Sequence, residues 1–521
     1  MIPLLIVSAV LGLAATVLAT VRWLRVAQRE HYIAPWVGVI EAVWLRTRPL
    51  ALVLWLVAVA LTVLALVGVG LGIGSRSTPW QFLLGLPLAF VILAFYPLGL
   101  SFRGRSSRLA WTPRLRRLLV AWVVVFGGVT ALLALGTGIV GLAIALILAP
   151  QLMDLSLAIM APIEKALSKK YLVSARKRLQ QVRPKIVAIT GSYGKTSTKG
   201  YVAHLLGGAF ATVASPASFN NLMGLSRAVN DRVVPGTEVF VAEMGIYGEG
   251  EIRELSQSFP PDIAAISTIG EAHLARMGSR EVIFRAKSEI TEKAGTVVLP
   301  IDDPLLLGLA EKCRAEGKTV ITVSTNPDNE ADVVVADSTV TVALAGSPVE
   351  TAPVTISGVG HAVNLAVAVG IATALGVPLS QLAGRLAALP DSAHRAEVQQ
   401  AASGVLIIDD TYNSNPVGAA RAVEGAAELA AERGGPLVVV TPGMVELGSV
   451  QRDRNRAFAA QVASAGGQLF AIGRTNRAAL VDGAPDARLF ARRELAVAAA
   501  LDQATDRGVI LYENDLPDHY P

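Results

Sequence analysis

Long stretches without a charged residue occupy the first third of the sequence, and they constrain its fold more than any other feature. Each has at least the roughly 20 residues that a helix needs to cross the hydrocarbon core of a bilayer. They run over Met1–Val21, Pro49–Ser75, Ser77–Phe102 and Leu118–Met153. A helix is the expected structure because it satisfies its own peptide groups where no water is present. Residues 1–180 are therefore predicted to form an α-helical transmembrane region.

The last of these stretches is too long for a single crossing. It continues to Ile163 with only Asp154 interrupting it, and the sequence Gly136-Thr137-Gly138 breaks it. We therefore expect five spans, the fourth over residues 118–135 and the fifth over residues 139–162. Asp154 falls near the cytoplasmic end of the fifth, where we expect its carboxylate to reach water rather than to mark a transport route.

Basic residues fall in alternate loops between the predicted spans. The first loop has five arginines and the third has six, whereas the second has only Arg76 and the fourth has none; six Lys and Arg follow the fifth span. Cytoplasmic loops are the ones enriched in Lys and Arg. The pattern predicts a multi-pass protein of the cytoplasmic membrane with its N-terminus outside and residues after 180 in the cytoplasm. A cleaved signal peptide is the alternative for Met1–Val21, but no basic residue precedes that stretch.

The rest of the 521-residue chain has the charge spacing of a soluble protein. Residues 1–180 carry 18 Lys and Arg against 4 Asp and Glu, and the remaining 341 residues carry 28 against 37. The basic excess thus belongs to the membrane loops, and we expect no nucleic acid partner. The single cysteine, Cys313, excludes an internal disulfide and a Cys-based zinc site.

A phosphate-binding loop is predicted directly after the membrane region. The apolar run KIVAIT from Lys185 leads into the turn Gly191–Thr196 and then into a helical pattern. Backbone N–H groups at such a helix start suit a polyphosphate, and in this arrangement Lys195 reaches the outer phosphates while the Thr196 hydroxyl binds Mg²⁺. The predicted nucleotide contacts are Gly191, Ser192, Tyr193, Gly194, Lys195, Thr196 and Ser197. Ile189 stands where the usual pattern has its first glycine, so an ordinary strand–turn–helix is the alternative for this segment taken alone.

Six further motifs follow at ordered intervals. They are SFNNLMG (Ser218–Gly224), VAEMG (Val241–Gly245), EAHLARMGS (Glu271–Ser279), RAKSEI (Arg285–Ile290), HRAE (His394–Glu397) and DDTYNSNP (Asp409–Pro416). Together with TGSYGKTSTK they resemble the Mur ligases, and FNN and DDTYNSNP are most similar to the branch that adds D-Ala-D-Ala. The resemblance covers residues 181–512 and none of the membrane region. It implies ligation in peptidoglycan synthesis, in which ATP phosphorylates a carboxylate and an amine displaces phosphate from the acyl phosphate.

The resemblance also implies a metal site that holds two Mg²⁺ ions. In it Glu243 shares the first ion with Thr196, His273 binds the second, and Lys287 is carbamylated by CO₂. Glu243 and His273 each follow a predicted strand, so we expect both at the carboxyl edge of a parallel sheet, where such sheets bind ligands. A carbamate replaces an ammonium with the anionic oxygen that Mg²⁺ prefers. The alternatives are that His273 is an ordinary surface or hydrogen-bonded histidine and that Lys287 is a solvated helix lysine. The residues taken as catalytic are Lys195, His273, Lys287 and Arg395.

Other nucleotide contacts are carried over from the same motifs. The resemblance assigns Asn220, Asn221 and Asn364 to the nucleotide, the last two to adenine, where an amide matches the donor and acceptor of the base. It assigns Arg395 to the ATP phosphates on closure of the C-terminal domain. It assigns Asp410, Tyr412, Asn413 and Asn415 to closure over the nucleotide and to orienting the amine. Turn and cap roles are the alternative for these asparagines.

Strand and helix patterns divide the soluble part in two. Residues 181–389 alternate strands such as TEVFVAEMG and DIAAISTIG with helices and predict an α/β P-loop central domain, with a hairpin in ADVVVADSTVTVALAG and a helix in HAVNLAVAVGIATALGV. Residues 390–521 predict a small α/β Rossmann-like domain. The G-x-G-x-x-G pattern is absent from it, so dinucleotide binding is not supported.

The sequence departs from the family in three places. No uridine-binding module stands before Lys185, and the segment ENDLPDHYP (Glu513–Pro521) has no lysine. The stretch Thr441-Pro442-Gly443-Met444 stands where the resembled branch usually carries an acid before the methionine. A cation from the C-terminal domain must then be an arginine, with Arg452, Arg454, Arg474 and Arg477 as candidates. His361 stands where the family often has asparagine. The first departure suggests a lipid-linked acceptor, or docking beside other membrane proteins of envelope synthesis.

We therefore expect a membrane-anchored, ATP-dependent amide ligase. Its partners are an amino acid or dipeptide donor, a carboxylate acceptor and membrane lipid. A poly-γ-glutamate synthetase is a second ligase interpretation, since it resembles this family in its ATPase domain. An ATP-driven transporter and a non-catalytic regulator are alternatives from other classes. Retention of Lys195, Glu243, His273 and Lys287 argues against the regulator.

Overall fold

The computed structural model describes residues 2–75, 80–102, 108–354, 362–390, 397–411, 414–517 and 519–521. The chain divides into two compact units. The first, here called the helical unit, comprises Met1–Leu167, Gly473–Thr475 and Leu516–Pro521. The second, the α/β unit, comprises Ser168–Ile472 and Asn476–Asp515.

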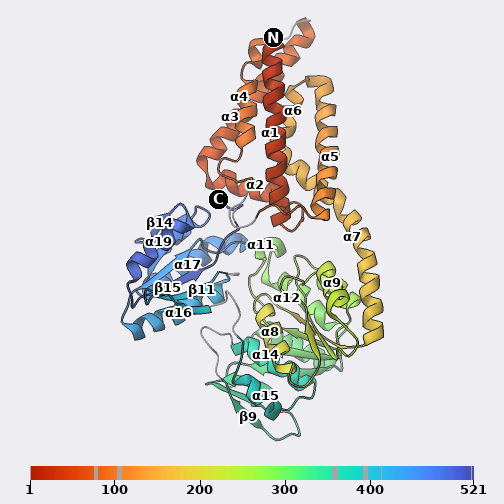
Figure 1. Cartoon of the computed structure of the whole chain (residues 1–521), viewed down its shortest axis with the longest axis vertical. Coiled ribbons are helices and arrows are strands. Elements are labelled where there is room, and N and C mark those ends of the chain that lie inside the picture. The colour runs from red at the N-terminus through yellow and green to blue at the C-terminus, as the bar shows by residue number, and fades with distance from the viewer. Residues whose placement is uncertain are drawn as a thin grey trace. The chain divides into compact units, whose positions relative to one another are not determined.

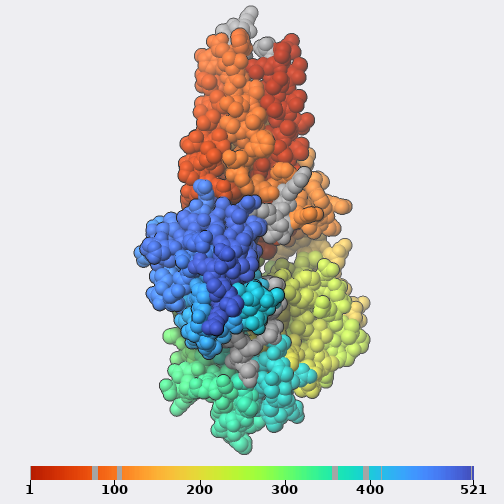
Figure 2. Space-filling view, turned by 60° about the vertical axis from the view of Figure 1, so that its left-hand side comes forward, coloured from red at the N-terminus to blue at the C-terminus, as the bar shows by residue number. Residues whose placement is uncertain are grey.

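Three helices of the helical unit are long and apolar enough to cross a membrane: α1 (Ile2–Arg29), α3 (Pro49–Ser75) and α5 (Pro113–Thr137). Figure 1 shows them bundled with α4 and α6 in red and orange. The shorter elements are α2 (Trp36–Thr47), η1 (Trp80–Leu83), α4 (Leu86–Phe95) and α6 (Val140–Ile147), and α7 (Ala149–Val182) leads into the α/β unit. Large side chains such as Trp23, Phe90 and Trp122 are buried inside the bundle. Leucines and valines such as Leu13 and Val124 are exposed on its outside. Figure 2 shows the surface of this unit, in red and orange, from another direction. An apolar exterior of this kind is what hydrocarbon requires.

The described residues yield fewer spans than the five predicted from sequence. They contain three such helices, or four if α6 and α7, bent by 69° at the break between them, count as one. At residues 77–102 the described part forms η1 and the short helix α4, so the span predicted there stays a prediction. Helix α4 carries Pro87 in its first turn and ends at Phe95, two residues before Pro97. Proline lacks the N–H that continues a helix and restricts the residue before it. Arg76 and the arginines at 103 and 105 lie outside the described residues.

Asp154 has a structural partner rather than a path to water, contrary to the expectation from sequence. It is 9% exposed, and its carboxylate accepts hydrogen bonds from the backbone N–H groups of Val37 (3.1 Å) and Gly38 (2.8 Å). Those groups belong to the first turn of α2 and have no partner within that helix. Asp154 therefore caps α2 from the helix α7.

The α/β unit contains a nine-stranded sheet in the order β2-β3-β1-β4-β5-β6-β7-β8-β9. The strands are β1 (Lys185–Thr190), β2 (Thr212–Ala214), β3 (Val239–Glu243), β4 (Ile263–Ile266), β5 (Thr296–Pro300), β6 (Thr319–Ser324), β7 (Val333–Ala336), β8 (Thr339–Val342) and β9 (Glu350–Pro353). Pairing is parallel from β2 to β7, and β8 and β9 add antiparallel pairs. The strands predicted from KIVAIT, TEVFVAEMG and DIAAISTIG are β1, β3 and β4, and the predicted hairpin is β7–β8.

Helices cover both faces of this sheet, so its central strands are buried on both sides, as parallel sheets require. On one face Val187 and Ile189 of β1 pack with α8 (Lys195–Leu206), α14 (Ala362–Ala374) and α15 (Leu379–Leu386). On the other face Ile186 and Ala188 pack in a second core. The helices on that face are α9 (Leu222–Arg232), α10 (Glu251–Ser258), α12 (Arg280–Ser288) and α13 (Pro304–Ala315), with the short α11 (Leu274–Met277) and η2 (Glu289–Thr291) nearby.

A six-stranded sheet follows, in the order β10-β11-β15-β12-β13-β14. Its strands are β10 (Glu397–Gln400), β11 (Leu406–Asp410), β12 (Leu437–Thr441), β13 (Gln468–Ile472), β14 (Arg488–Phe490) and β15 (Val509–Glu513). Its helices are α16 (Pro416–Arg433), η3 (Gly448–Val450), α17 (Gln451–Ser464), α18 (Arg477–Gly483) and α19 (Arg493–Ala504). Only β10 runs antiparallel. The predicted α/β character of residues 390–521 is confirmed within the described part.

Candidate functional site

The loop between β1 and α8 is built around glycines that no other residue can replace without strain. Gly191 has φ 154° and Gly194 has φ 77°. A Cβ added at Gly191 would lie 2.0 Å from Ser267 Oγ, and one added at Gly194 would lie 2.0 Å from Asn364 Oδ1. Lys195 Nζ donates to the carbonyl oxygen of Gly191 at 2.7 Å. The lysine thus lies over a tight loop at the start of a helix, as a phosphate-binding loop requires.

Contacts with the segment after β4 hold this loop in place. Ser192 Oγ accepts a hydrogen bond from Gly270 N at 2.9 Å, and Tyr193 Oη accepts one from Glu271 N at 2.8 Å. Ser267 Oγ donates to the carbonyl oxygen of Tyr193. Burial raises the pKa of Tyr193, so its hydroxyl stays protonated. The loop and the segment that carries His273 are therefore one connected structure.

Glu243 ends β3 beside the loop and has three side-chain partners. Its Oε2 accepts from Thr196 Oγ1 at 3.0 Å and from Lys199 Nζ at 2.7 Å, and its Oε1 accepts from Asn220 Nδ2 at 3.2 Å. Burial alone would raise the pKa of Glu243, but the ammonium groups of Lys199 and Lys195 hold it below its ordinary value. The carboxylate is therefore ionised and ready to bind a cation.

Lys199 was not among the site residues predicted from the sequence, although its place in the motif TSTK indicates that it lies near Thr196. It stands three residues after Thr196 on α8, so the two side chains share a helix face. Both side chains therefore point toward the end of β3, where Glu243 lies. The ammonium group of Lys199 donates to the buried carboxylate of Glu243, which is a structural role for a lysine at this position.

His273 lies in a second group near the loop. It has a left-handed backbone, φ 61°, and its Nδ1 lies 2.7 Å from Glu446 Oε2. Glu446 belongs to the loop after β12, and Arg276 Nη2 lies 3.5 Å from its other oxygen. Burial lowers the pKa of His273, and Glu446 opposes that shift. The sequence did not point to Glu446, because the family pattern predicts an acid before Met444, whereas Glu446 follows that methionine by two residues.

Lys287 lies on α12 and is 2% exposed. Among the residues that the structure describes, none makes a hydrogen bond or an ion pair with its ammonium group. Burial lowers its pKa well below the ordinary value, and the charge of Lys195 adds to the shift. A buried lysine of this kind is favoured as the neutral amine.

The charge of Lys195 affects three of these side chains. The charge of Lys195 lowers the pKa of Glu243, of His273 and of Lys287. Such an effect requires proximity in a medium that screens charge poorly. The structure therefore brings the loop lysine, the strand-end glutamate, the histidine and the helix lysine to one region.

The donor atoms of these side chains fit Mg²⁺ unequally. In the described ranges no three His, Cys, Asp or Glu side chains form a metal cluster. Thr196 and Glu243 offer a hydroxyl and a carboxylate oxygen, which fit a hard cation. His273 and Lys287 offer only nitrogen, so a second Mg²⁺ fits them only if Lys287 gains an anionic oxygen.

The predicted nucleotide asparagines have different structural roles. Asn364 is buried against Gly194, and within the described chain its Oδ1 has no hydrogen-bond partner. Asn221 caps α9 by accepting from Gly224 N at 2.9 Å, and Asn220 contacts Glu243. Their contacts with a nucleotide stay predictions.

Residues of the smaller sheet are only partly described. Arg395, Tyr412 and Asn413 lie outside the described residues, as does His361. Asn415 caps α16 by accepting from Gly418 N at 2.9 Å, and the backbone oxygen of Asp410 accepts from Asn514 N at 3.1 Å. Arg454 is the arginine candidate that reaches the loop region, through a bidentate contact with Glu271.

Glu513 is a further buried acid that sequence analysis did not single out. It ends β15, accepts from Thr441 Oγ1 at 2.7 Å and contacts Ser414 Oγ. Burial raises its pKa to about 7, and the nearby Asp410 adds to the shift. Glu513 therefore places a buried acid beside Thr441, on the strand that neighbours β12.

Comparison with known families matches two consecutive parts of the chain. Residues 189–372 match the Mur ligase middle domain, and residues 394–512 match the Mur ligase, glutamate ligase domain. The first match includes the phosphate loop, Glu243, His273 and Lys287, and the second includes most of the smaller sheet.

Curated relatives match part of the same region. The UDP-N-acetylmuramoyl-tripeptide–D-alanyl-D-alanine ligase of Mycobacterium tuberculosis (strain ATCC 25618 / H37Rv) is 35% identical over 243 residues, 44% of this chain and 46% of that protein. The ligase of the same name from Bacillus subtilis (strain 168) is 32% identical over 279 residues, 53% of this chain and 60% of that protein. The chain spans about half the length of the curated relatives that it matches.

Solved structures share the fold. The MurF ligase of Thermotoga maritima in complex with ADP has a TM-score of 0.57 at 23% identity, over 67% of this chain and 80% of that one. MurF from Acinetobacter baumannii has a TM-score of 0.57 at 24% identity, over 67% and 77%.

Proposed function

Because the chain belongs to the Mur ligase family through its middle and glutamate ligase domains, we propose that it is an ATP-dependent ligase that forms an amide bond. The observation that supports this most is the arrangement beside the phosphate loop, where Lys195 Nζ lies 2.7 Å from the Gly191 oxygen and Thr196 Oγ1 lies 3.0 Å from Glu243 Oε2. A carboxylate and a triphosphate repel one another, so their reaction needs fixed cations at the point where they meet.

The reaction has two steps. A carboxylate oxygen of the acceptor attacks the γ-phosphorus of ATP and ADP leaves, which gives an acyl phosphate. The amine nitrogen then attacks the acyl carbon, phosphate leaves with the electron pair of the broken C–O bond, and the amine proton passes to solvent. Both steps depend mainly on charge neutralisation and orientation.

Lys195 and the backbone N–H groups of the Gly191–Gly194 loop bind the outer phosphates in this proposal. Thr196 and Glu243 would hold one Mg²⁺, which supplies charge neutralisation at the triphosphate when bound. Lys199 keeps Glu243 ionised, since its Nζ lies 2.7 Å from that carboxylate.

Lys287 is proposed to carry a carbamate. CO₂ reacts with a neutral amine, and burial favours that form of Lys287. The carbamate oxygen and His273 would then hold the second Mg²⁺. Glu446 fixes the ring of His273 by its contact with Nδ1, which leaves Nε2 as the free nitrogen for that ion.

The substrates are proposed from the relatives. Their names state a UDP-N-acetylmuramoyl-tripeptide and D-alanyl-D-alanine, so we propose a muramyl tripeptide as the carboxylate acceptor and D-Ala-D-Ala as the amine. The helical unit is proposed to anchor the enzyme at the cytoplasmic membrane, with the N-terminus outside and the α/β unit in the cytoplasm. Its three long apolar helices support this placement.

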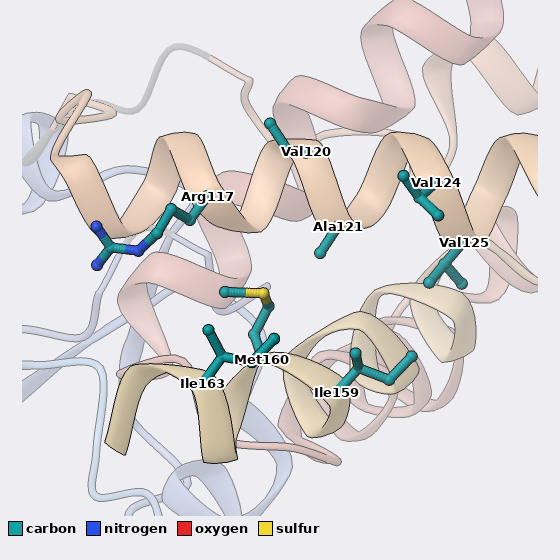
Figure 3. Close-up of a pocket in the computed structure, with 8 residues that line it drawn as sticks. All are labelled: Arg117, Val120, Ala121, Val124, Val125, Ile159, Met160 and Ile163. Atoms are coloured by element: carbon teal, nitrogen blue, oxygen red, sulfur yellow. The ribbon is translucent and has the colours of Figure 1, made fainter. Parts of the chain in front are cut away.

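An apolar groove in the helical unit supports a lipid-linked form of the acceptor. The groove lies between α5 and α7, has a volume of about 410 Å³ and is shown in Figure 3. It is lined by Arg117, Val120, Ala121, Val124, Val125, Ile159, Met160 and Ile163. The single charged side chain, Arg117, lies at one end and pairs with Glu164 at 2.6 Å. A hydrocarbon chain fits the apolar wall, and its polar carrier fits the charged end.

Isotope transfer tests the proposed chemistry. The full chain in lipid nanodiscs is given acceptor labelled with ¹⁸O in its carboxylate, with ATP and D-Ala-D-Ala. One ¹⁸O should appear in each released phosphate, and Lys195→Ala should abolish release. Unlabelled phosphate, or release that does not depend on the amine, would indicate an ATPase and refute the ligase. Comparing lipid-linked with UDP-linked acceptor decides which carrier is used.

A further inference from the structure

The segment that follows β4, residues 267–271, is bonded directly to the phosphate loop. Gly270 N donates to Ser192 Oγ at 2.9 Å, and that hydroxyl donates in turn to the Gly270 oxygen at 3.1 Å. Glu271 N donates to the Tyr193 hydroxyl at 2.8 Å. A Cβ added at Gly270 would lie 2.3 Å from Cε2 of Tyr193, so the tyrosine ring packs on this segment. The position of the segment therefore sets the position of the loop.

The side chain of Glu271 pairs with Arg454, which lies on α17 in the same α/β unit. Arg454 Nε lies 3.1 and 2.9 Å from the two carboxylate oxygens, and its Nη2 contacts Oε1 as well. The glutamate side chain is 19% exposed and the arginine side chain 47%. An ion pair at such exposure adds little to stability, but a forked arginine–carboxylate contact has a defined geometry. Its main effect is to fix where Glu271 lies.

The loop after β12 contacts the same region a few residues later. Ala275 N donates to the backbone oxygen of Glu446 at 2.9 Å, and the Glu446 side chain is bonded to His273. A Cβ added at Gly448 would lie 3.3 Å from Ala275 Cα. These contacts hold the short helix α11 against the loop, so the pair formed by Arg454 belongs to a continuous set of contacts.

The charge of Arg454 also acts on the tyrosine. Burial raises the pKa of Tyr193, and Arg454 is among the groups that oppose this shift. Such an effect weakens with distance and with screening by water. The guanidinium therefore lies near the phenol as well as near Glu271.

We propose that Arg454 is a positioning residue for the phosphate loop, acting through Glu271 and the Tyr193 hydroxyl. The forked contact holds Glu271, and the N–H of Glu271 holds the tyrosine. The tyrosine in turn holds the turn whose backbone N–H groups suit a polyphosphate. The sequence names Arg454 only as a candidate cation of the smaller sheet, and this indirect role differs from a direct contact with phosphate.

The consequence for catalysis rests on the proposed ligase function. A loop that is held less firmly must be ordered when ATP binds, and that ordering reduces affinity. Arg454→Gln should therefore raise KM for ATP about 3-fold and change kcat by less than about 2-fold, since no reacting group is removed.

Hydrogen exchange of the full chain in nanodiscs tests the positioning without nucleotide. Arg454→Gln and Glu271→Gln should each speed amide exchange of residues 191–196 about 3-fold. The double variant should exchange no faster than either single variant, because both changes remove the same contact. Arg454→Lys keeps the charge but not the fork and should give an intermediate rate. Gly270→Ala displaces the Tyr193 ring and should speed exchange with both charges in place.

Arg456→Gln is the matched control. Arg456 is also an exposed arginine of α17, but its Nη2 lies 3.6 Å from Asp453 of the same helix. It should leave exchange of residues 191–196 unchanged. The melting temperatures of Arg454→Gln and Arg456→Gln should agree, which separates lost positioning from lost folding.

Three results would overturn the positioning role: unchanged exchange in Arg454→Gln, additive acceleration in the double variant, or equal acceleration by Arg456→Gln. Calorimetry with a non-hydrolysable ATP analogue should find binding about 3-fold weaker in Arg454→Gln. If the unaltered chain bound no analogue, the ligase function would be refuted, whereas the exchange rates would still decide the positioning role.

Discussion

Lys199 Nζ lies 2.7 Å from Glu243 Oε2, and the two side chains are 7% and 4% exposed. Thr196 bonds to the same oxygen at 3.0 Å. The pair provides a fixed positive charge beside the carboxylate that is proposed to bind Mg²⁺. The carboxylate is thereby kept ionised inside the protein.

Lys199→Met should leave Glu243 as a buried charge without its closest partner. Breaking a buried pair in this way costs about 3–5 kcal/mol of unfolding free energy. The pKa of Glu243 is lowered in the folded protein, so its contribution is present above its ordinary pKa of 4.5 and lost as the pH falls below it. The variant should therefore melt at lower temperature at pH 7, and saturating Mg²⁺ should recover part of the loss.

The control for that experiment is Lys312→Met, since Lys312 is an exposed lysine that lies 3.9 Å from Glu316. Thermal unfolding of both variants, with and without Mg²⁺, measures the difference. Equal melting temperatures for the two variants would contradict a stabilising role of Lys199.

Gly194→Ala should disrupt the phosphate loop. The new Cβ would lie 2.0 Å from Asn364 Oδ1, and φ at this position is 77°. Adding Asn364→Ala removes the clash but leaves the left-handed backbone, which costs roughly 1–2 kcal/mol for a residue with a Cβ. ATP binding measured by calorimetry should be lost in the single variant and partly recovered in the double variant. No recovery would show that the clash is not the cause.

Lys287→Met should lower ligase activity by about 100-fold or more, because an anionic group is lost at the charged centre of the site. Burial lowers the pKa of Lys287, which favours the neutral amine that reacts with CO₂. A carbamate signal should appear in ¹³C NMR when labelled bicarbonate is added, and it should be absent from the variant. An identical signal in both proteins would assign the carbamate to another lysine.

Glu513→Gln should flatten the dependence of stability on pH. The pKa of Glu513 is raised from 4.5 to about 7. A raised acid is more protonated when folded, so stability is highest below pH 4.5 and falls as the pH rises to about 7, by about 3 kcal/mol at most. Glutamine cannot ionise and still bonds to Thr441 and Ser414. The variant should be the more stable protein at pH 8 and no more stable at pH 4 in chemical unfolding, and the opposite order would refute the assignment.

The sequence alone predicted those site residues that directly follow a recognisable strand or turn. The β-branched runs that became β1 and β3 placed Thr196 and Glu243 at one sheet edge, since parallel strands share their carboxyl ends. Contacts between distant segments were not anticipated. His273 meets Glu446 across 173 residues, and Thr441 meets Glu513 across 72. No local pattern reports such a pairing.

The membrane region shows a second limit of local patterns. Uncharged length predicted a span over residues 77–102, but the described part of that stretch contains only η1 and α4. Hydropathy reports how readily side chains move from water into an apolar medium. It takes no account of the backbone N–H that Pro87 and Pro97 lack and that a continuous helix needs. The capping role of Asp154 was likewise invisible, because its partners Val37 and Gly38 lie 117 and 116 residues away.

The most direct test of the account is the product formed by the full chain in nanodiscs from ATP, a muramyl tripeptide and D-Ala-D-Ala. Mass spectrometry should find the amide-linked pentapeptide, with one ADP released for each product and none formed by Lys195→Ala. Release of ADP without an amide product would contradict the ligase function. Ligation of glutamate, with no turnover of either the UDP-linked or the lipid-linked muramyl tripeptide, would contradict the proposed substrates.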